Sequence, residues 1–221
     1  MKPIVIAFTG EAHSGKDTSA DYLVEYFKSL GSSAIKVCLA DQLKLICQKL
    51  IKLFYGIEIP KEEFYDLSEK ERVRSDYPLF AGQPFKLRTV LQQVGTEIFR
   101  DLLWESVWCD YIKKTKIMNC QYQFIIISDC RFLDEIKYFS KLIENHENLL
   151  SNKIIDSFIT CRIIRENKLK LAMENHKHKS ESDILNLPVD VEINNNDTFD
   201  QLYQNLNEKI ITKLNPYFEH N

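Results

Sequence analysis

The chain has 221 residues, of which 44% are hydrophobic and 28% charged, and a formal net charge of -3. This composition excludes disorder over most of the chain, and the length suits a single domain, 1–221, with room for inserted lobes. The near-neutral charge argues against a nucleic-acid polymer as partner, because no excess of positive charge is available to displace counterions.

The six cysteines show no C-x-x-C spacing, and no stretch approaches the roughly 20 apolar residues that a membrane-spanning helix needs. We therefore expect a soluble, cytoplasmic protein with reduced thiols and no membrane partner.

Apolar runs and helical periodicity alternate along the chain. The pattern predicts an α/β fold of the P-loop NTPase type, with a doubly wound, five-stranded parallel sheet. The most hydrophobic run, 124–128 (FIIIS), is expected in the centre of the sheet. The predicted strands are 3–9, 34–40, 124–128, 157–164 and 189–193, and the predicted helices are 17–30, 42–54, 86–108, 133–144, 166–173 and 199–214.

The segment from Gly10 to Thr18, GEAHSGKDT, matches the phosphate-loop pattern G-x-x-x-x-G-K-x-T and lies between a predicted strand and a predicted helix. Backbone N–H groups of such a loop and of the following helix surround a phosphate, and the lysine reaches its oxygens. The residues assigned to ATP binding are Gly10, His13, Ser14, Gly15, Lys16, Asp17 and Thr18, together with Arg162 of a later strand.

Two carboxylates are candidates for holding Mg²⁺. Asp17 stands where phosphate loops usually carry Ser or Thr, and Asp129 ends the strand 124–128. The simpler alternatives are an acidic residue in the first turn of a helix for Asp17 and a turn former for Asp129.

In the helix predicted for 86–108, four polar residues fall on one arc at about 100° per residue. Arg88 and Arg100 suit phosphate, Gln92 can contact a base edge, and Phe99 could stack on a base or pack locally. The polar arc holds Arg88, Gln92, Thr96 and Arg100, and the opposite, apolar arc holds Val90, Leu91, Val94, Ile98 and Leu102.

Arg162 and Arg165 lie within and at the end of the fourth predicted strand, before a polar segment. A lid at 165–184 would let such cations neutralise charge during phosphoryl transfer. Alternatively, Arg162 simply points out of the sheet.

Five motifs in matching order resemble the deoxynucleoside monophosphate kinases of phages and viruses. They are GEAHSGKDT, LADQLK (39–44), RTVLQQVGTEIFR (88–100), SDCRF (128–132) and HKSE (178–181), and together they span most of the chain. The resemblance implies ATP-dependent, Mg²⁺-assisted phosphorylation of a deoxynucleoside monophosphate.

By the same resemblance, a helical monophosphate-binding lobe is inserted at 42–112. Lys16 and Thr18 would bind ATP phosphates, Arg88 and Gln92 the acceptor nucleotide, and Arg131 and Arg165 would surround the transferred phosphate. Asp129 joins the catalytic set. Asp41 and Lys44 of the LADQLK motif are assigned to substrate binding, while the segment 57–83 matches no known motif.

Two competing functions stay open. Asp41 could serve as a general base, which would suit a kinase of a hydroxyl-bearing metabolite, and a phosphomevalonate-like acceptor belongs to the same alternative. A nucleotide-gated switch would need a water-positioning residue, for which the sequence offers no candidate. Trp104 and Trp108 could reach the surface of a homodimer or the core.

Overall fold

The computed structural model describes residues 2–119, 121–143, 154–166 and 184–218. Its centre is one five-stranded sheet in which every adjacent pair of strands is parallel, and the order is β2-β3-β1-β4-β5. The strands are β1 (Ile4–Thr9), β2 (Ala34–Val37), β3 (Phe124–Ile127), β4 (Ser157–Ile164) and β5 (Val191–Asn194).

β1 and β3 are buried along their whole length, because helices cover both faces of a parallel sheet. β1 holds the middle of the sheet, with Val5 opposite Ile125 of β3 and Phe158 of β4. The run predicted to be central, β3, is an interior strand beside it. All five predicted strands are present, and the predicted fold class is confirmed.

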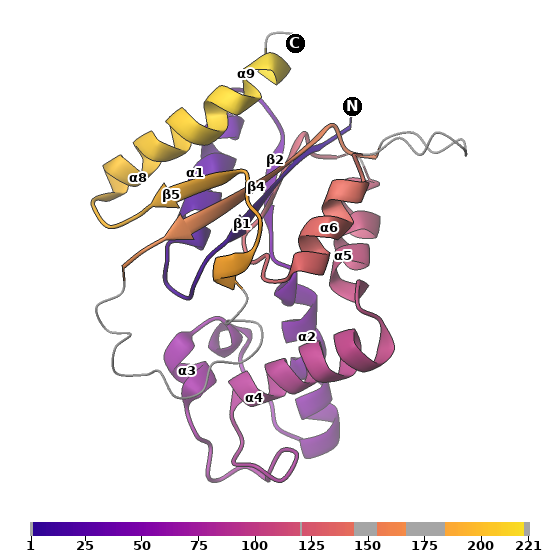
Figure 1. Ribbon diagram of the computed structural model, residues 1–221. Coiled ribbons are helices and arrows are strands. Elements are labelled where there is room, and N and C mark those ends of the chain that lie inside the picture. Colours follow the sequence, from indigo (N-terminus) through magenta and orange to yellow (C-terminus); the bar gives the residue numbers. More distant parts are fainter. Residues whose placement is uncertain (1, 120, 144–153, 167–183, 219–221) are drawn as a thin grey trace. The chain divides into compact units, whose positions relative to one another are not determined.

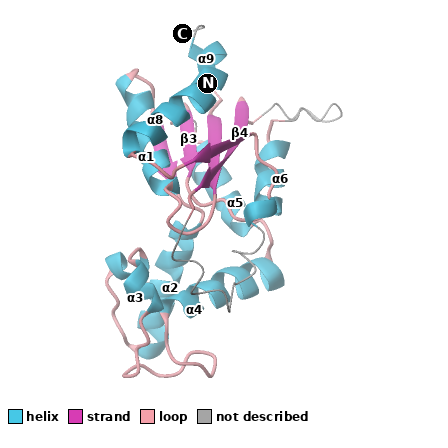
Figure 2. Ribbon diagram, turned by 60° about the vertical axis from the view of Figure 1, so that its left-hand side comes forward, coloured by secondary structure: helices cyan, strands magenta, loops and turns pink. Residues whose placement is uncertain are grey.

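Helices lie on both faces of the sheet (Figures 1 and 2). On one face, Phe27 of α1 stacks on Phe124 with the ring centroids 3.8 Å apart. On the other, Phe139 of α6 packs against Phe158 of β4. The helical segments that accompany the sheet are α1 (Lys16–Ser29), α6 (Leu133–Lys141), η5 (Ile184–Asn186), α8 (Phe199–Leu206), η6 (Asn207–Ile211) and α9 (Thr212–Phe218).

The chain divides into two compact units. Residues 1–38 and 111–221 form the sheet unit, and residues 39–110, inserted between β2 and β3, form the helical unit. The helical unit contains α2 (Ala40–Tyr55), η1 (Lys61–Phe64), α3 (Leu67–Glu71), α4 (Leu87–Gln92) and η2 (Gln93–Leu103), and the chain leaves it through α5 (Val107–Ile112) and η3 (Lys113–Ile117).

The helix expected over 86–108 is α-helical only to Gln92 and π-helical over η2, and it ends at Trp104. A π-helix bonds each N–H to the fifth residue before it, so faces computed at about 100° per residue drift out of phase. The predicted arcs still hold at Val94, which is buried, but are wrong from Ile98 onward. Arg100 is buried, whereas Ile98 and Leu102 are 43% and 78% exposed.

The second predicted strand, 34–40, also ends earlier than expected. β2 stops at Val37, and α2 begins at Ala40, so Asp41 lies in the first turn of a helix instead of at a strand end. Neither this helix nor any other in the described part of the chain is long and apolar enough to cross a membrane.

Candidate active site

The phosphate loop joins β1 to α1 and has a backbone that favours glycine. Gly10 and Gly15 have φ values of 140° and 104°, and His13 also lies in the left-handed region at 61°. A Cβ on Gly10 would lie 2.4 Å from the Ile163 carbonyl oxygen, and one on Gly15 would lie 2.3 Å from Asn195 Nδ2. The loop therefore approaches the ends of β4 and β5 more closely than any side chain at these positions permits.

Ser14, within this loop, has a buried hydroxyl whose Oγ contacts no hydrogen-bond partner among the described residues. Its N–H closes a turn on the Glu11 carbonyl at 3.2 Å. A buried hydroxyl of this kind inside a loop with left-handed residues suits an anionic ligand.

Lys16, the first residue of α1, folds its side chain back over the loop. Its Nζ donates to the carbonyl oxygens of Gly10 at 2.8 Å and Glu11 at 2.7 Å. Burial, and secondarily the positive charge of Arg131, lower the pKa of Lys16 from 10.5 to about 8. The ammonium is thus held at the phosphate loop in an environment that weakens its hold on the proton.

Of the two predicted metal ligands, Asp129 is buried just after β3. The turn that follows is fixed by Glu135, whose Oε2 accepts from the N–H groups of Arg131 and Phe132 at 2.7 and 3.1 Å. Asp129 and Arg131 therefore flank a turn of defined conformation, and both charges act on Lys16.

Asp17 is exposed in the first turn of α1, and its carboxylate lies 3.7 Å from Lys36 Nζ. Lys36 also pairs with Asp21 at 2.7 Å. Thr18, in the same turn, is partly exposed. Within the described residues, no three His, Cys, Asp or Glu side chains gather as a metal-binding group, so a cation here would need oxygens from a phosphate ligand.

The two arginines of β4 differ in their surroundings. Arg162 is buried and bonds to the Glu192 carboxylate and the Leu187 carbonyl, contacts that favour a structural role. Arg165 follows the strand and is exposed. Most of the predicted lid, 165–184, lies outside the described residues, as do the HKSE motif and nearly all of the helix predicted for 166–173.

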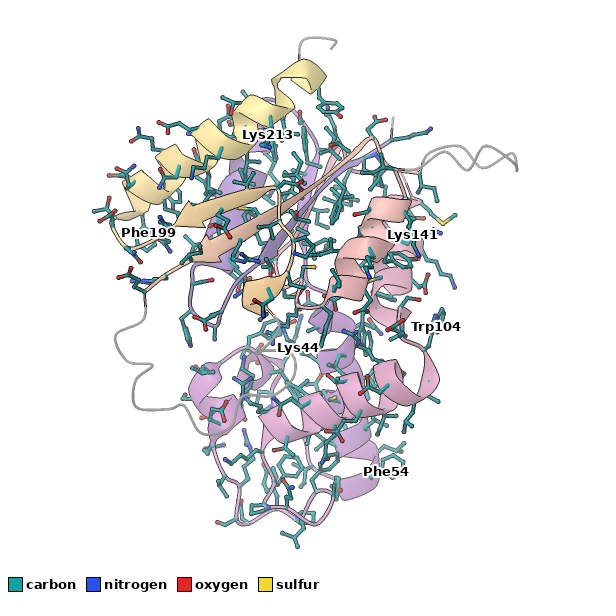
Figure 3. The ribbon with its side chains drawn as sticks, viewed as in Figure 1. Lys44, Phe54, Trp104, Lys141, Phe199 and Lys213 are labelled. Atoms are coloured by element: carbon teal, nitrogen blue, oxygen red, sulfur yellow. The ribbon has the colours of Figure 1, made fainter. Side chains whose placement is uncertain are left out.

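In the helical unit, Asp41 and Lys44 of α2 meet Tyr65 (Figure 3 shows Lys44). Tyr65 Oη and Lys44 Nζ both donate to Asp41 Oδ1, at 2.9 and 3.3 Å. The Lys44 ammonium also lies 3.7 Å from the centroid of the Tyr65 ring. The structure thus brings these two predicted residues together and adds Tyr65, which lies in the stretch without a recognised motif.

The other residues predicted to bind the acceptor lie on α4 and η2. Arg88 forms an ion pair with Glu71, and Gln92 is partly exposed one turn later. Phe99 packs on Trp108 with centroids 5.3 Å apart, the local packing that was the alternative to base stacking. Trp108 is buried, and Trp104 is 49% exposed.

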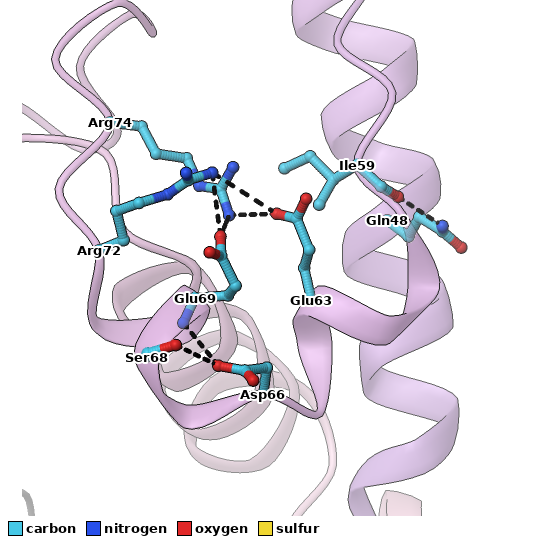
Figure 4. A network of polar contacts seen from close by, with 8 residues as sticks. All are labelled: Gln48, Ile59, Glu63, Asp66, Ser68, Glu69, Arg72 and Arg74. Atoms are coloured by element: carbon cyan, nitrogen blue, oxygen red, sulfur yellow. Dashed lines mark hydrogen bonds and ion pairs between the residues drawn. The ribbon is translucent and has the colours of Figure 1, made fainter.

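A buried ion network organises the segment without a motif (Figure 4). Arg74, with its side chain 3% exposed, bonds to Glu63 and Glu69, and Arg72 reaches Glu69 from a largely exposed position. The Arg74 N–H also donates to the Phe85 carbonyl at 2.9 Å. These contacts join Arg74 to the first half of the segment and to Phe85 just beyond its end, within the helical unit.

Three contributors went unnoticed in the sequence. Asn195 and Ile163 approach the loop glycines, and Glu135 fixes the turn after Asp129. Only Asn195 had a usable signal: an Asn run directly follows a strand, at the sheet edge where the carboxyl ends of parallel strands meet.

No protein-family model and no curated protein sequence matches the chain. Solved kinases are similar in fold. An APS kinase of Mycobacterium tuberculosis, in complex with AMPPNP and APS, is 8% identical at a TM-score of 0.50, covering 95% of this chain and 98% of its own.

Two further solved kinases are similar at lower TM-scores. A thymidylate kinase of Candida albicans is 15% identical with a TM-score of 0.48, covering 97% of this chain and 93% of its own. A shikimate kinase of Acinetobacter baumannii is 12% identical with a TM-score of 0.41, covering 96% and 95%. The strand order and the glycine loop together define an α/β protein with the P-loop fold.

Proposed function

We propose that the protein transfers the terminal phosphoryl group of ATP to a deoxynucleoside monophosphate, giving the diphosphate and ADP. The observation that carries the proposal is the phosphate loop, with its tightly packed glycines and the Lys16 ammonium held over it. The resemblance of the five motifs to deoxynucleoside monophosphate kinases supports a deoxynucleoside monophosphate as the acceptor.

The loop fits the phosphates of ATP. Gly10 and Gly15 have no room for a side chain, because the Ile163 carbonyl and the Asn195 amide lie against them, and this close packing holds the loop in its conformation. The Ser14 hydroxyl is buried without a partner among the described residues. Backbone amides from Gly10 to Gly15, including His13 and Ser14, would surround the β-phosphate. Lys16 and Thr18 would contact further phosphate oxygens.

Asp129, and Asp17 if Lys36 releases it, would hold Mg²⁺ together with phosphate oxygens, as small hard cations prefer. The cation would neutralise charge on the bridging and terminal phosphates. Arg162 is also a predicted ATP ligand, but its contacts with Glu192 and Leu187 give it less freedom for that role.

The acceptor would bind to the helical unit through Asp41, Lys44, Arg88 and Gln92. A guanidinium binds a monophosphate in bidentate geometry, and an amide can recognise a base edge. The roles of Phe99 and Arg100 stay predictions, because one packs on Trp108 and the other is buried.

The acceptor phosphate is already anionic near neutral pH, so the transfer needs no general base. Orientation of the two phosphates and neutralisation of their charge carry the reaction. Arg131 and Arg165 would supply that neutralisation beside Lys16.

The runner-up is a kinase of a hydroxyl-bearing metabolite. Asp41 is 49% exposed, and its Oδ1 accepts two hydrogen bonds, an arrangement that could orient a carboxylate toward a hydroxyl. Asp41→Asn distinguishes this function from the proposed one. It would abolish transfer to a hydroxyl but only weaken binding of a phosphate acceptor.

A coupled ADP-release assay over the common NMPs, dNMPs and hydroxyl metabolites with ATP and Mg²⁺ tests the proposal. Rapid turnover confined to dNMPs supports it. ADP release that ignores every nucleotide acceptor would reject it.

Lys16→Ala should lower kcat by at least about 100-fold, because a charged contact to the transferred phosphate is lost. Lys28→Ala is the matched control, since Lys28 lies on the same helix and pairs with Glu25 at the protein surface. Near-normal turnover of Lys16→Ala would show that the phosphate loop takes no part in phosphoryl transfer.

A further inference from the structure

Asn195 is a buried amide in a position that otherwise carries apolar side chains. Burial alternates along β5, with Val191 and Ile193 buried and Glu192 and Asn194 exposed. Asn195 takes the next inward position, is 7% exposed, and continues the ladder by donating its N–H to the Ile164 carbonyl at 2.7 Å. A polar group so deeply buried needs a specific partner.

That partner is the phosphate loop. Asn195 Nδ2 donates to the Ser14 carbonyl oxygen at 2.8 Å and occupies the space that a Cβ of Gly15 would need. The amide therefore reaches from the end of β5 across β4 to the loop that follows β1, in line with the strand order.

The contact determines which way one peptide group faces. In a trans peptide the C=O and the following N–H point in opposite directions, so holding the Ser14 oxygen toward Asn195 turns the Gly15 N–H away from it. Glycine does not hold this orientation by itself, because it tolerates φ of either sign. A reversed peptide would present a carbonyl oxygen to the bound phosphate in place of an N–H donor.

We propose that Asn195 is a positioning residue that locks the Ser14–Gly15 peptide with its N–H directed at the phosphates of ATP. The inference rests on the proposed function, since it takes the loop to be the ATP-phosphate site. Asn195 acts through the backbone and not by contact with the reacting atoms.

The test compares four proteins: wild type, Asn195→Ala, Asn195→Asp and Asn194→Ala. Asn194→Ala is the matched control, because it removes an exposed amide one residue away. Calorimetry measures Kd for ATP and for inorganic tripolyphosphate, which lacks the base, and steady-state assays give KM for the phosphoryl acceptor. Thermal denaturation confirms that each variant is folded at the assay temperature.

We expect Asn195→Ala to raise Kd for ATP and Kd for tripolyphosphate by about tenfold or more. The KM for the acceptor should change less than about twofold. Asn195→Asp keeps the size of the side chain but sets a carboxylate against the Ser14 carbonyl, so it should raise both Kd values further. Asn194→Ala should match wild type.

If Asn195→Ala or Asn195→Asp folds and keeps the wild-type Kd for tripolyphosphate, Asn195 does not position the Ser14–Gly15 peptide for phosphate binding. A rise in the acceptor KM as large as the rise in Kd for ATP would also overturn the proposed role, because it would indicate that the whole protein is disturbed and not only the loop. Wild type that binds neither ATP nor tripolyphosphate would reject the proposed function as well. Tight ATP binding without transfer to any dNMP would reject only the proposed reaction.

Discussion

Lys16 is the residue at which burial and the proposed chemistry oppose each other. Burial favours the neutral amine, whereas phosphate binding needs the ammonium. Arg131 strengthens the first effect, and the carboxylates of Asp17 and Asp129 counteract it, which leaves the pKa at about 8.

This lowered pKa predicts the pH dependence of ATP use. The Lys16 cation is present below pH 8 and is lost above it, so kcat/KM for ATP should fall as pH rises through about 8. kcat/KM reports the free protein, in which no phosphate yet stabilises the cation. The measurement is a profile of kcat/KM for ATP between pH 6 and 10.

Lys16→Arg is the control, because a guanidinium keeps its charge over this range. Its profile should lack the alkaline fall, even if its activity is lower throughout. The same fall in Lys16→Arg would assign the titration to another group.

At the scale of elements, the close approach of the phosphate loop to β4 gives a second prediction. Gly10→Ala should lower the free energy of unfolding by roughly 3 kcal/mol or more, because the new Cβ meets the Ile163 carbonyl at 2.4 Å and φ is 140°. That carbonyl belongs to a central strand and cannot easily move. Urea unfolding measures the loss.

Gly31→Ala provides the comparison. Gly31 has φ of 80°, but a Cβ there meets nothing within 4 Å, so only backbone strain of about 1 kcal/mol is expected. Equal losses in the two variants would mean that the contact with β4 contributes nothing.

The ion network of the helical unit gives the third prediction. Arg74→Ala leaves the carboxylates of Glu63 and Glu69 without their buried cation and should destabilise the protein by about 3 kcal/mol. Arg72→Ala, at a side chain 54% exposed, should change stability by less than about 1 kcal/mol. Chemical denaturation of both variants checks the contrast, which would disappear if the network were only a surface feature.

The elements were predictable to different degrees. Buried strands of a parallel sheet are continuous apolar runs, so β1, β3 and β4 could be identified directly. The end of β2 could not, because LADQLK is compatible with either a strand or a helix start. The π-helical hydrogen bonding of η2 has no signature in the spacing of Val94, Ile98 and Leu102, since it depends on packing.

The candidate site divides in the same way. Glycine spacing was enough to locate the loop between β1 and α1, because few sequences satisfy that geometry. The contact of Asn195 with Ser14 joins residues 181 positions apart, and Tyr65 meets Asp41 through a segment without a motif. Such pairings arise only when the chain folds, so local pattern does not reveal them.

At the scale of the whole molecule, the two units separate the residues proposed to bind ATP from those proposed to bind the acceptor. All residues proposed for ATP belong to the sheet unit, and all those proposed for the acceptor belong to the helical unit. Arg88→Ala should therefore raise KM for the acceptor about tenfold or more and leave Kd for ATP within twofold. Steady-state kinetics and calorimetry measure the two quantities.

Glu71→Ala distinguishes a ligand role from simple pairing, because it removes the carboxylate that bonds Arg88 and keeps the guanidinium. Its acceptor KM should stay near that of wild type. If Arg88→Ala and Glu71→Ala both lower stability and leave the acceptor KM unchanged, Arg88 has only a structural role in the ion pair.

The position of the inserted unit in the sequence also has a consequence for folding. The edge strand β2 pairs with β3 from the far side of the insertion, and Gln123 bonds to Ser33 across 90 residues of chain. Closing so long a loop is slow while it is unstructured, because its entropy must be lost before the pairing is gained. A helical unit that folds first would shorten the open loop between β2 and β3, so we expect the lobe proposed to bind the acceptor also to speed completion of the sheet.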